Sequence, residues 1–126
     1  MSQEITMSIL STQVGGDHYS GMKYQPVVFA SKMRLNFVQG SILKYVSRYP
    51  RKNGKQDLEK ASHFCQLGLE VQPVNFALPV DSEVHKYVEQ NGFDEEMEQL
   101  ISDIVNQHWV GISAHILNIS EKVYGH

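Results

Sequence analysis

Apolar positions recur at helical spacing along most of the chain. Val38, Ile42 and Val46 form one stripe, and a second runs from Met97 to Val105. Residues three and four apart share one side of a helix. The pattern predicts helices over residues 26–34, 37–49, 56–71, 81–91, 95–105 and 109–123. We therefore expect an all-α fold, a compact bundle of about five helices with an irregular N-terminal segment.

Several residues mark where these helices begin and end. Pro26 is favoured at a first helical position. Asn36 with Gln39 three residues later has the pattern of a capping box. Pro50 disfavours helix at the residue before it, which predicts a stop. Asp94 is a suitable N-cap for the helix that follows it.

Length and composition favour a single domain over residues 1–126. No apolar run approaches the ~20 residues that span a bilayer, and the start MSQEITMSIL lacks the basic residues of a signal peptide. We expect residues 1–14 to be frayed or a short edge strand, and residues 15–25 to form a glycine-rich loop. No internal repeat is visible. Cys65 lies on a predicted core side, which indicates packing and not a nucleophile.

Charge divides the chain into two parts. Residues 15–71 carry nine Lys/Arg against four Asp/Glu, whereas residues 80–126 carry two against nine. The basic part, residues 14–71, suits an anionic ligand. The acidic part, residues 80–126, is a candidate oligomerisation element. Head-to-tail self-association or a solvated acidic face would explain the same asymmetry.

A stripe of Gly40, Lys44 and Arg48 runs along the helix predicted at 37–49. Gly40 and Ser41 lie near the helix start, where backbone N–H groups favour anions. Lys44 and Arg48 could then hold phosphate oxygens. The alternative is close helix packing at Gly40 with two solvated cations beside it.

The segment GGDHYSGMKY, residues 15–24, is the second candidate for ligand contact. Gly15 and Gly16 would let the backbone approach a ligand, Asp17 could accept from a sugar hydroxyl or orient His18, and the rings of Tyr19 and Tyr24 could stack on a base. The alternative is an ordinary turn in which Asp17 bonds its own backbone. The chain contains no P-loop, dinucleotide fingerprint, HExxH or CxxC motif, and we predict no metal site from paired ligands.

The elements VGGDHY, MKYQP, LNFVQGSILKYVSRYPRKNG and DLEKASHF occur in this order, within a span of about Val14 to Leu69 that is nearly half the chain. Together they resemble a small phage-protein family of unknown function that carries the label "nucleotide kinase". The resemblance implies a nucleotide ligand and a location in the host cytoplasm. The positions that match its pattern are Gly15, Gly16, Asp17, His18, Tyr19, Gln25, Pro26, Phe37, Gly40, Lys44, Tyr45, Arg48, Lys52, Gly54, Asp57, Leu58, Lys60 and Ala61. One departure is Ser41, where the family has Asn.

Two functions fit these features. The first is a nucleoside-monophosphate kinase, for which ATP and Mg²⁺ are the expected cofactors. Lys44, Arg48 and Lys52 would neutralise the phosphate groups of the bound nucleotides. Its catalytic candidates are His18 and Asp17, and only Asp17 and Asp57 could hold the metal. The alternative is a binding protein without turnover that sequesters a host signalling nucleotide and so blunts an antiphage defence system.

We expect the nucleotide site to lie near a subunit interface of a homo-oligomer, because one small chain offers a small pocket. Nucleic-acid binding ranks last, since the pI near 6.0 and the acidic second part disfavour a long backbone-tracking groove. We expect no membrane association.

Overall fold

The computed structural model describes residues 21–51 and 53–125 of the chain. These residues form six helices and no strand, so the expected all-α class is confirmed and the number of helices is close to the expected five or so. The helices are α2 (Pro26–Met33), α3 (Phe37–Arg48), α4 (Lys55–Val71), α5 (Asp81–Gln90), α6 (Glu95–Val105) and α7 (Trp109–Tyr124). Among them, none combines the length and apolar character needed to cross a membrane.

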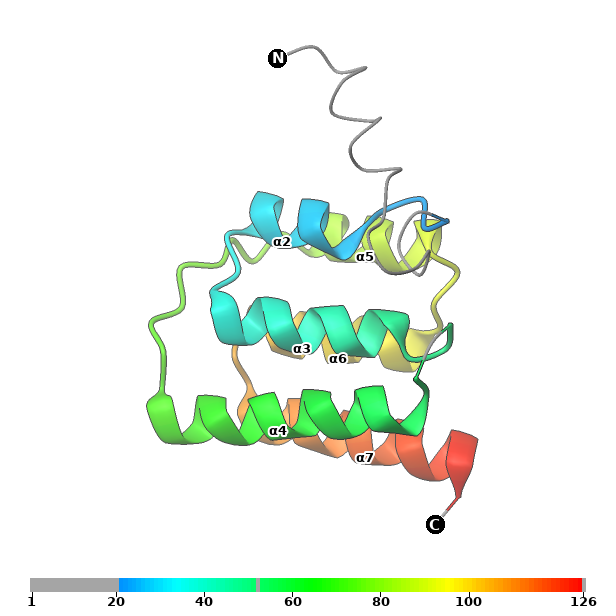
Figure 1. Cartoon of the computed structure of the whole chain (residues 1–126). Coiled ribbons are helices and arrows are strands. Elements are labelled where there is room, and N and C mark those ends of the chain that lie inside the picture. The colour runs from blue at the N-terminus through cyan, green and yellow to red at the C-terminus, as the bar shows by residue number, and fades with distance from the viewer. Residues whose placement is uncertain (1–20, 52, 126) are drawn as a thin grey trace.

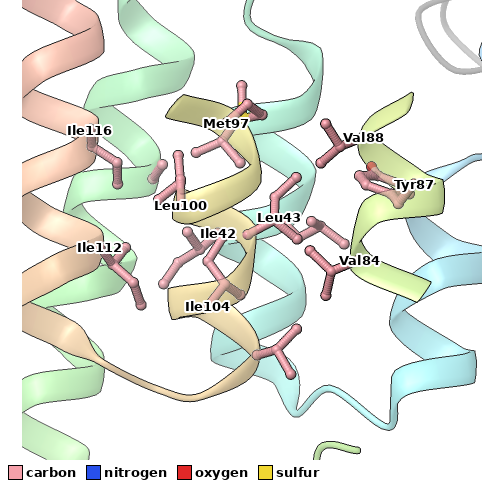
Figure 2. Close-up of a cluster of buried hydrophobic side chains, with 14 of the residues drawn as sticks. Ile42, Leu43, Val84, Tyr87, Val88, Met97, Leu100, Ile104, Ile112 and Ile116 are labelled. Atoms are coloured by element: carbon pink, nitrogen blue, oxygen red, sulfur yellow. The ribbon is translucent and has the colours of Figure 1, made fainter. Parts of the chain in front are cut away.

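The helices form two rows of three (Figure 1). In that view α2, α3 and α4 lie one below the other, and α5, α6 and α7 form the row behind them. Helix α4 packs on both α3 and α7, while α3 also contacts α6. Side chains of α3, α5 and α6 meet between the rows, among them Leu43, Tyr87 and Met97 (Figure 2). One continuous hydrophobic cluster therefore joins both rows.

The predicted helix starts are present. Pro26 occupies the beginning of α2. Asn36 and Gln39 form the capping box of α3, with the Asn36 side chain accepting from the Gln39 N–H at 2.9 Å. The Asp94 side chain accepts from the Met97 N–H and caps α6. These caps satisfy donors that the first helical turn leaves without a partner.

The connection between α2 and α3 and the connection between α5 and α6 have the same backbone geometry, and we call each of them a corner. Arg34 (φ 60°) and Gly92 (φ 69°) both take the left-handed conformation after their helices. The next residues close the corners alike, since the Leu35 N–H donates to the Ala30 carbonyl and the Phe93 N–H to the Val88 carbonyl, each at 2.9 Å. Each row of helices thus contains a corner of the same geometry, although the sequence shows no internal repeat there.

Candidate functional site

Tyr45 on α3 is surrounded by cationic groups. The Nζ atoms of Lys44 and Lys60 lie 4.6 Å and 5.5 Å from its ring centroid, and the guanidinium carbon of Arg48 lies 5.0 Å from it. The ring also stacks on Phe64 of α4, with centroids 6.0 Å apart and planes inclined by 21°. We call Lys44, Tyr45, Arg48, Lys60 and Phe64 the Tyr45 cluster.

The cations of this cluster differ in what else they contact. Arg48 forms an ion pair with the fully buried Asp57 of α4, which holds its guanidinium in place. Lys44 and Lys60 form no ion pair within the described part of the chain. The surface around Tyr45 therefore keeps the positive charge of two lysines, while Arg48 serves the packing of α3 on α4.

A mostly apolar hollow of about 250 Å³ adjoins the cluster between α2 and α3. Pro26, Val27, Ala30 and Gly40 line it, and Lys44 lies at its edge. Among the described residues, a Cβ atom added at Gly40 would meet nothing within 4 Å outside its own helix. Gly40 therefore opens onto this hollow, and no described helix packs closely against it, contrary to the close-packing alternative.

Two predicted ligand contacts are placed in the interior instead. Tyr24 is 6% exposed, and its ring packs edge-on against Phe29 and Tyr87. Its hydroxyl donates to Glu83 at 2.6 Å, and burial, followed by this carboxylate, raises the tyrosine pKa. A ring enclosed in this way has no face for a base, so the stacking role predicted for Tyr24 was wrong. Ser41 is also buried.

The other predicted ligand contacts lie outside the described residues, namely Gly15, Gly16, Asp17, His18, Tyr19 and Lys52. The described end of the glycine-rich loop, Gly21 to Lys23, lines a different cavity from the hollow beside Gly40, together with Tyr49 and Arg51.

Asp57 does not fit the role of a magnesium ligand. Its carboxylate oxygens accept three hydrogen bonds from Arg48 and one from the Asn53 N–H, and the side chain is inaccessible to solvent. Across residues 21–51 and 53–125, no group of three His, Cys, Asp or Glu side chains could hold a metal ion. Of the two predicted metal holders, only Asp17 remains a prediction.

A family model described as "Protein of unknown function (DUF3310)" matches residues 15–66. The matched segment is similar to a family without an assigned function. It covers fewer than half of the residues and contains α2, α3 and the first part of α4, including the whole Tyr45 cluster. Neither a curated protein nor a solved structure matches the chain. The match supports the resemblance seen in the motifs, but the label "nucleotide kinase" stays a prediction.

Proposed function

We propose that this chain binds a nucleotide at the Tyr45 cluster and the adjoining hollow. The observation that carries the proposal is the position of Lys44, which borders both the apolar hollow and the cationic surface. The base would occupy the hollow and the phosphates would lie on the outer surface near Lys44 and Lys60. Sites that enclose a whole small molecule measure about 300–1,000 Å³, so a hollow of about 250 Å³ suits one part of such a ligand.

Charge and shape support this arrangement. A base is flat and mostly apolar, whereas phosphate oxygens prefer charge-assisted hydrogen bonds from lysine and arginine. Gly40 leaves the wall of the hollow without a side chain, and Pro26 and Ala30 supply apolar contacts. Arg48 acts as a positioning residue, because its guanidinium is held between the Tyr45 ring and Asp57.

We favour binding without turnover over phosphoryl transfer. A kinase needs carboxylates that position metal-bound phosphates, and Asp57 is fully engaged in joining α3 to α4. In the phage setting that the resemblance implies, a protein that retains an unaltered nucleotide would sequester a host signalling nucleotide.

The test mixes stoichiometric protein with ATP, Mg²⁺ and a panel of nucleoside monophosphates and cyclic nucleotides. Chromatography follows each free nucleotide before and after heat denaturation of the protein. A nucleotide that leaves solution and returns unchanged on heating supports the proposal. New diphosphates would favour the kinase, and a panel that stays in solution unaltered would contradict both functions.

The site is tested with Lys44→Gln combined with Lys60→Gln. We expect at least about tenfold weaker binding of the retained nucleotide, because each charge-assisted hydrogen bond contributes about 1.5–3 kcal/mol. The matched control is Lys32→Gln with Lys86→Gln, which removes the same charge from α2 and α5. Equal effects of the two double variants would reduce the role of the cluster to net charge and contradict the proposed site.

A further inference from the structure

A second cavity, of about 420 Å³, lies where three distant segments of the chain meet. Residues 21–23 before α2, the end of α3 with the turn after it, and the α5–α6 corner all contribute to its lining. We call it the end cavity. Its volume lies within the range of about 300–1,000 Å³ typical of small-molecule sites. Sequence reasoning missed it because one wall comes from residues 90–97, outside the motif-bearing segment.

Hydrogen bonds fix the walls of the end cavity. The Asn91 side chain accepts from the Tyr24 N–H at 3.2 Å and donates to the Tyr24 carbonyl at 2.8 Å, which attaches the segment before α2 to the α5–α6 corner. The hydroxyl of Ser47, another lining residue, is bonded to that of Tyr87 at 2.7 Å in a buried position. A cavity with bonded walls requires little rearrangement to accept a ligand.

The lining combines apolar and cationic side chains. Met22, Phe93 and Met97 supply apolar surface, and Lys23 and Arg51 supply positive charge. A Cβ atom at Gly21 would lie 3.0 Å from Nη1 of Arg51, so the glycine allows the guanidinium to lie against the backbone.

Asp94 and Tyr49 add polar groups to the lining of the end cavity. The carboxylate on the lining, that of Asp94, accepts from the Met97 N–H as the cap of α6. The pKa of Tyr49 is raised by burial and then by the nearby Tyr124 and Asp94, so its hydroxyl remains a neutral donor at neutral pH. The described lining thus carries the cationic side chains of Lys23 and Arg51, the carboxylate of Asp94 and the phenol of Tyr49.

We propose that the end cavity binds a small anion with an apolar body, such as an aryl phosphate or aryl carboxylate. The apolar body would contact Met22, Phe93 and Met97, and the anionic group would lie between Lys23 and Arg51. The Tyr45 cluster contributes no residue to this cavity. The inference therefore does not depend on the proposed nucleotide function.

The test uses the full chain labelled with ¹³C in its methionine methyl groups and phenyl phosphate as the probe. Resonances are assigned with Met22→Leu and Met97→Leu. We expect saturable shifts of the Met22 and Met97 signals and little change at Met33, which is buried in the core away from this lining. Phenol should bind at least about tenfold more weakly, because it cannot form the charge-assisted bonds.

Variants then separate the end cavity from general charge effects. Lys23→Gln with Arg51→Gln should weaken phenyl phosphate binding at least about tenfold, whereas Lys32→Gln with Lys86→Gln and Lys44→Gln with Lys60→Gln should leave it unchanged. Gly21→Ala keeps every charge but displaces the guanidinium, so it should also weaken binding. The proposal is overturned if the probe causes no shift at Met22 and Met97, if phenol binds equally well, or if folded variants at Lys23 and Arg51 bind normally.

Discussion

Arg48 of α3 donates hydrogen bonds to both carboxylate oxygens of Asp57 on α4. Its Nε lies 3.2 Å from each oxygen, and its Nη2 lies 3.0 Å from Oδ1. The side chain of Asp57 is inaccessible to solvent and that of Arg48 is 15% exposed. The same guanidinium lies over the Tyr45 ring, so one residue joins the packing of two helices to the candidate nucleotide site.

Removing one partner of this pair should destabilise the fold strongly. Asp57→Ala leaves a mostly buried guanidinium without its carboxylate, which typically costs about 3–5 kcal/mol. Urea denaturation should show this loss in the free energy of unfolding. The double change Arg48→Met with Asp57→Leu should cost less than Asp57→Ala alone, because no charge remains buried. A loss below about 1 kcal/mol for Asp57→Ala would show that the pair is no more than a surface ion pair.

Replacing either of two helical glycines, Gly40 or Gly68, with alanine should change the stability of the protein in opposite directions. At Gly40 the added Cβ meets nothing within 4 Å in the described part of the chain, so Gly40→Ala should stabilise the protein by roughly 0.5–1 kcal/mol through helix propensity. At Gly68 the Cβ would lie 2.5 Å from carbons of the Trp109 ring. Gly68→Ala should therefore cost about 1–3 kcal/mol through overpacking. Thermal unfolding of both variants checks this, and a decrease in Tm for Gly40→Ala would contradict the open position of Gly40.

Local signals in the sequence predicted the helix boundaries well, because a cap depends on residues three or four positions apart. Asn36, Gln39 and Asp94 are examples. Helical periodicity was less reliable at helix ends. Leu69 follows the buried Cys65 by four residues on the same helical side, yet it is 44% exposed. Val123 likewise follows the buried Ile119 by four residues, yet it is 53% exposed. Periodicity shows which side of a helix is apolar, but not how far the neighbouring helix extends along it.

Tertiary partners explain what the sequence could not predict about the site. The Gly40–Lys44–Arg48 stripe was expected to act as one surface, but Gly40 faces the hollow and Arg48 pairs with Asp57. The partners of Tyr24 lie near residues 83–91, beyond the reach of local patterns. Lys60 completes the Tyr45 cluster from the next helix. Its place in the DLEKA motif was the only signal that could have indicated this.

Tyr24→Phe tests the reassignment of this tyrosine to the core. The change removes the hydroxyl that donates to Glu83 and keeps the ring. We expect a loss of about 1–2 kcal/mol in the free energy of unfolding, since the acceptor is charged and partly buried. The pKa of Glu83 is lowered mainly by this hydrogen bond, so it should rise in the variant. Carbon-detected NMR titration of the carboxylate measures this change.

Tyr45→Phe is the matched control, because it also removes a phenolic hydroxyl and keeps the ring. It should leave the pKa of Glu83 unchanged. Any retained nucleotide should bind Tyr24→Phe as tightly as the unaltered protein. Markedly weaker binding, with the variant still folded, would restore the stacking role that the buried ring argues against.

Acid should weaken the contact between α6 and α7 through Glu96. The Glu96 carboxylate is hydrogen-bonded to Nδ1 of His115 at 2.5 Å and lies 3.6 Å from Nζ of Lys122. The pKa of Glu96 is therefore lowered below its ordinary value of 4.5, first by the His115 hydrogen bond. A carboxylate with a lower pKa in the folded state adds stability above its unfolded pKa. This contribution is lost as pH falls through the folded value.

Glu96→Gln should consequently be less stable than the unaltered protein at about pH 7, and the difference should shrink as the pH is lowered below about 4. Urea denaturation at a series of pH values gives this difference directly. Glu95→Gln is the matched control, since Glu95 is exposed on the same helical turn and forms no ion pair within the described residues. Its difference from the unaltered protein should stay small throughout. A Glu96→Gln difference that is independent of pH, or that grows on acidification, would mean that the charge of Glu96 does not stabilise the α6–α7 contact.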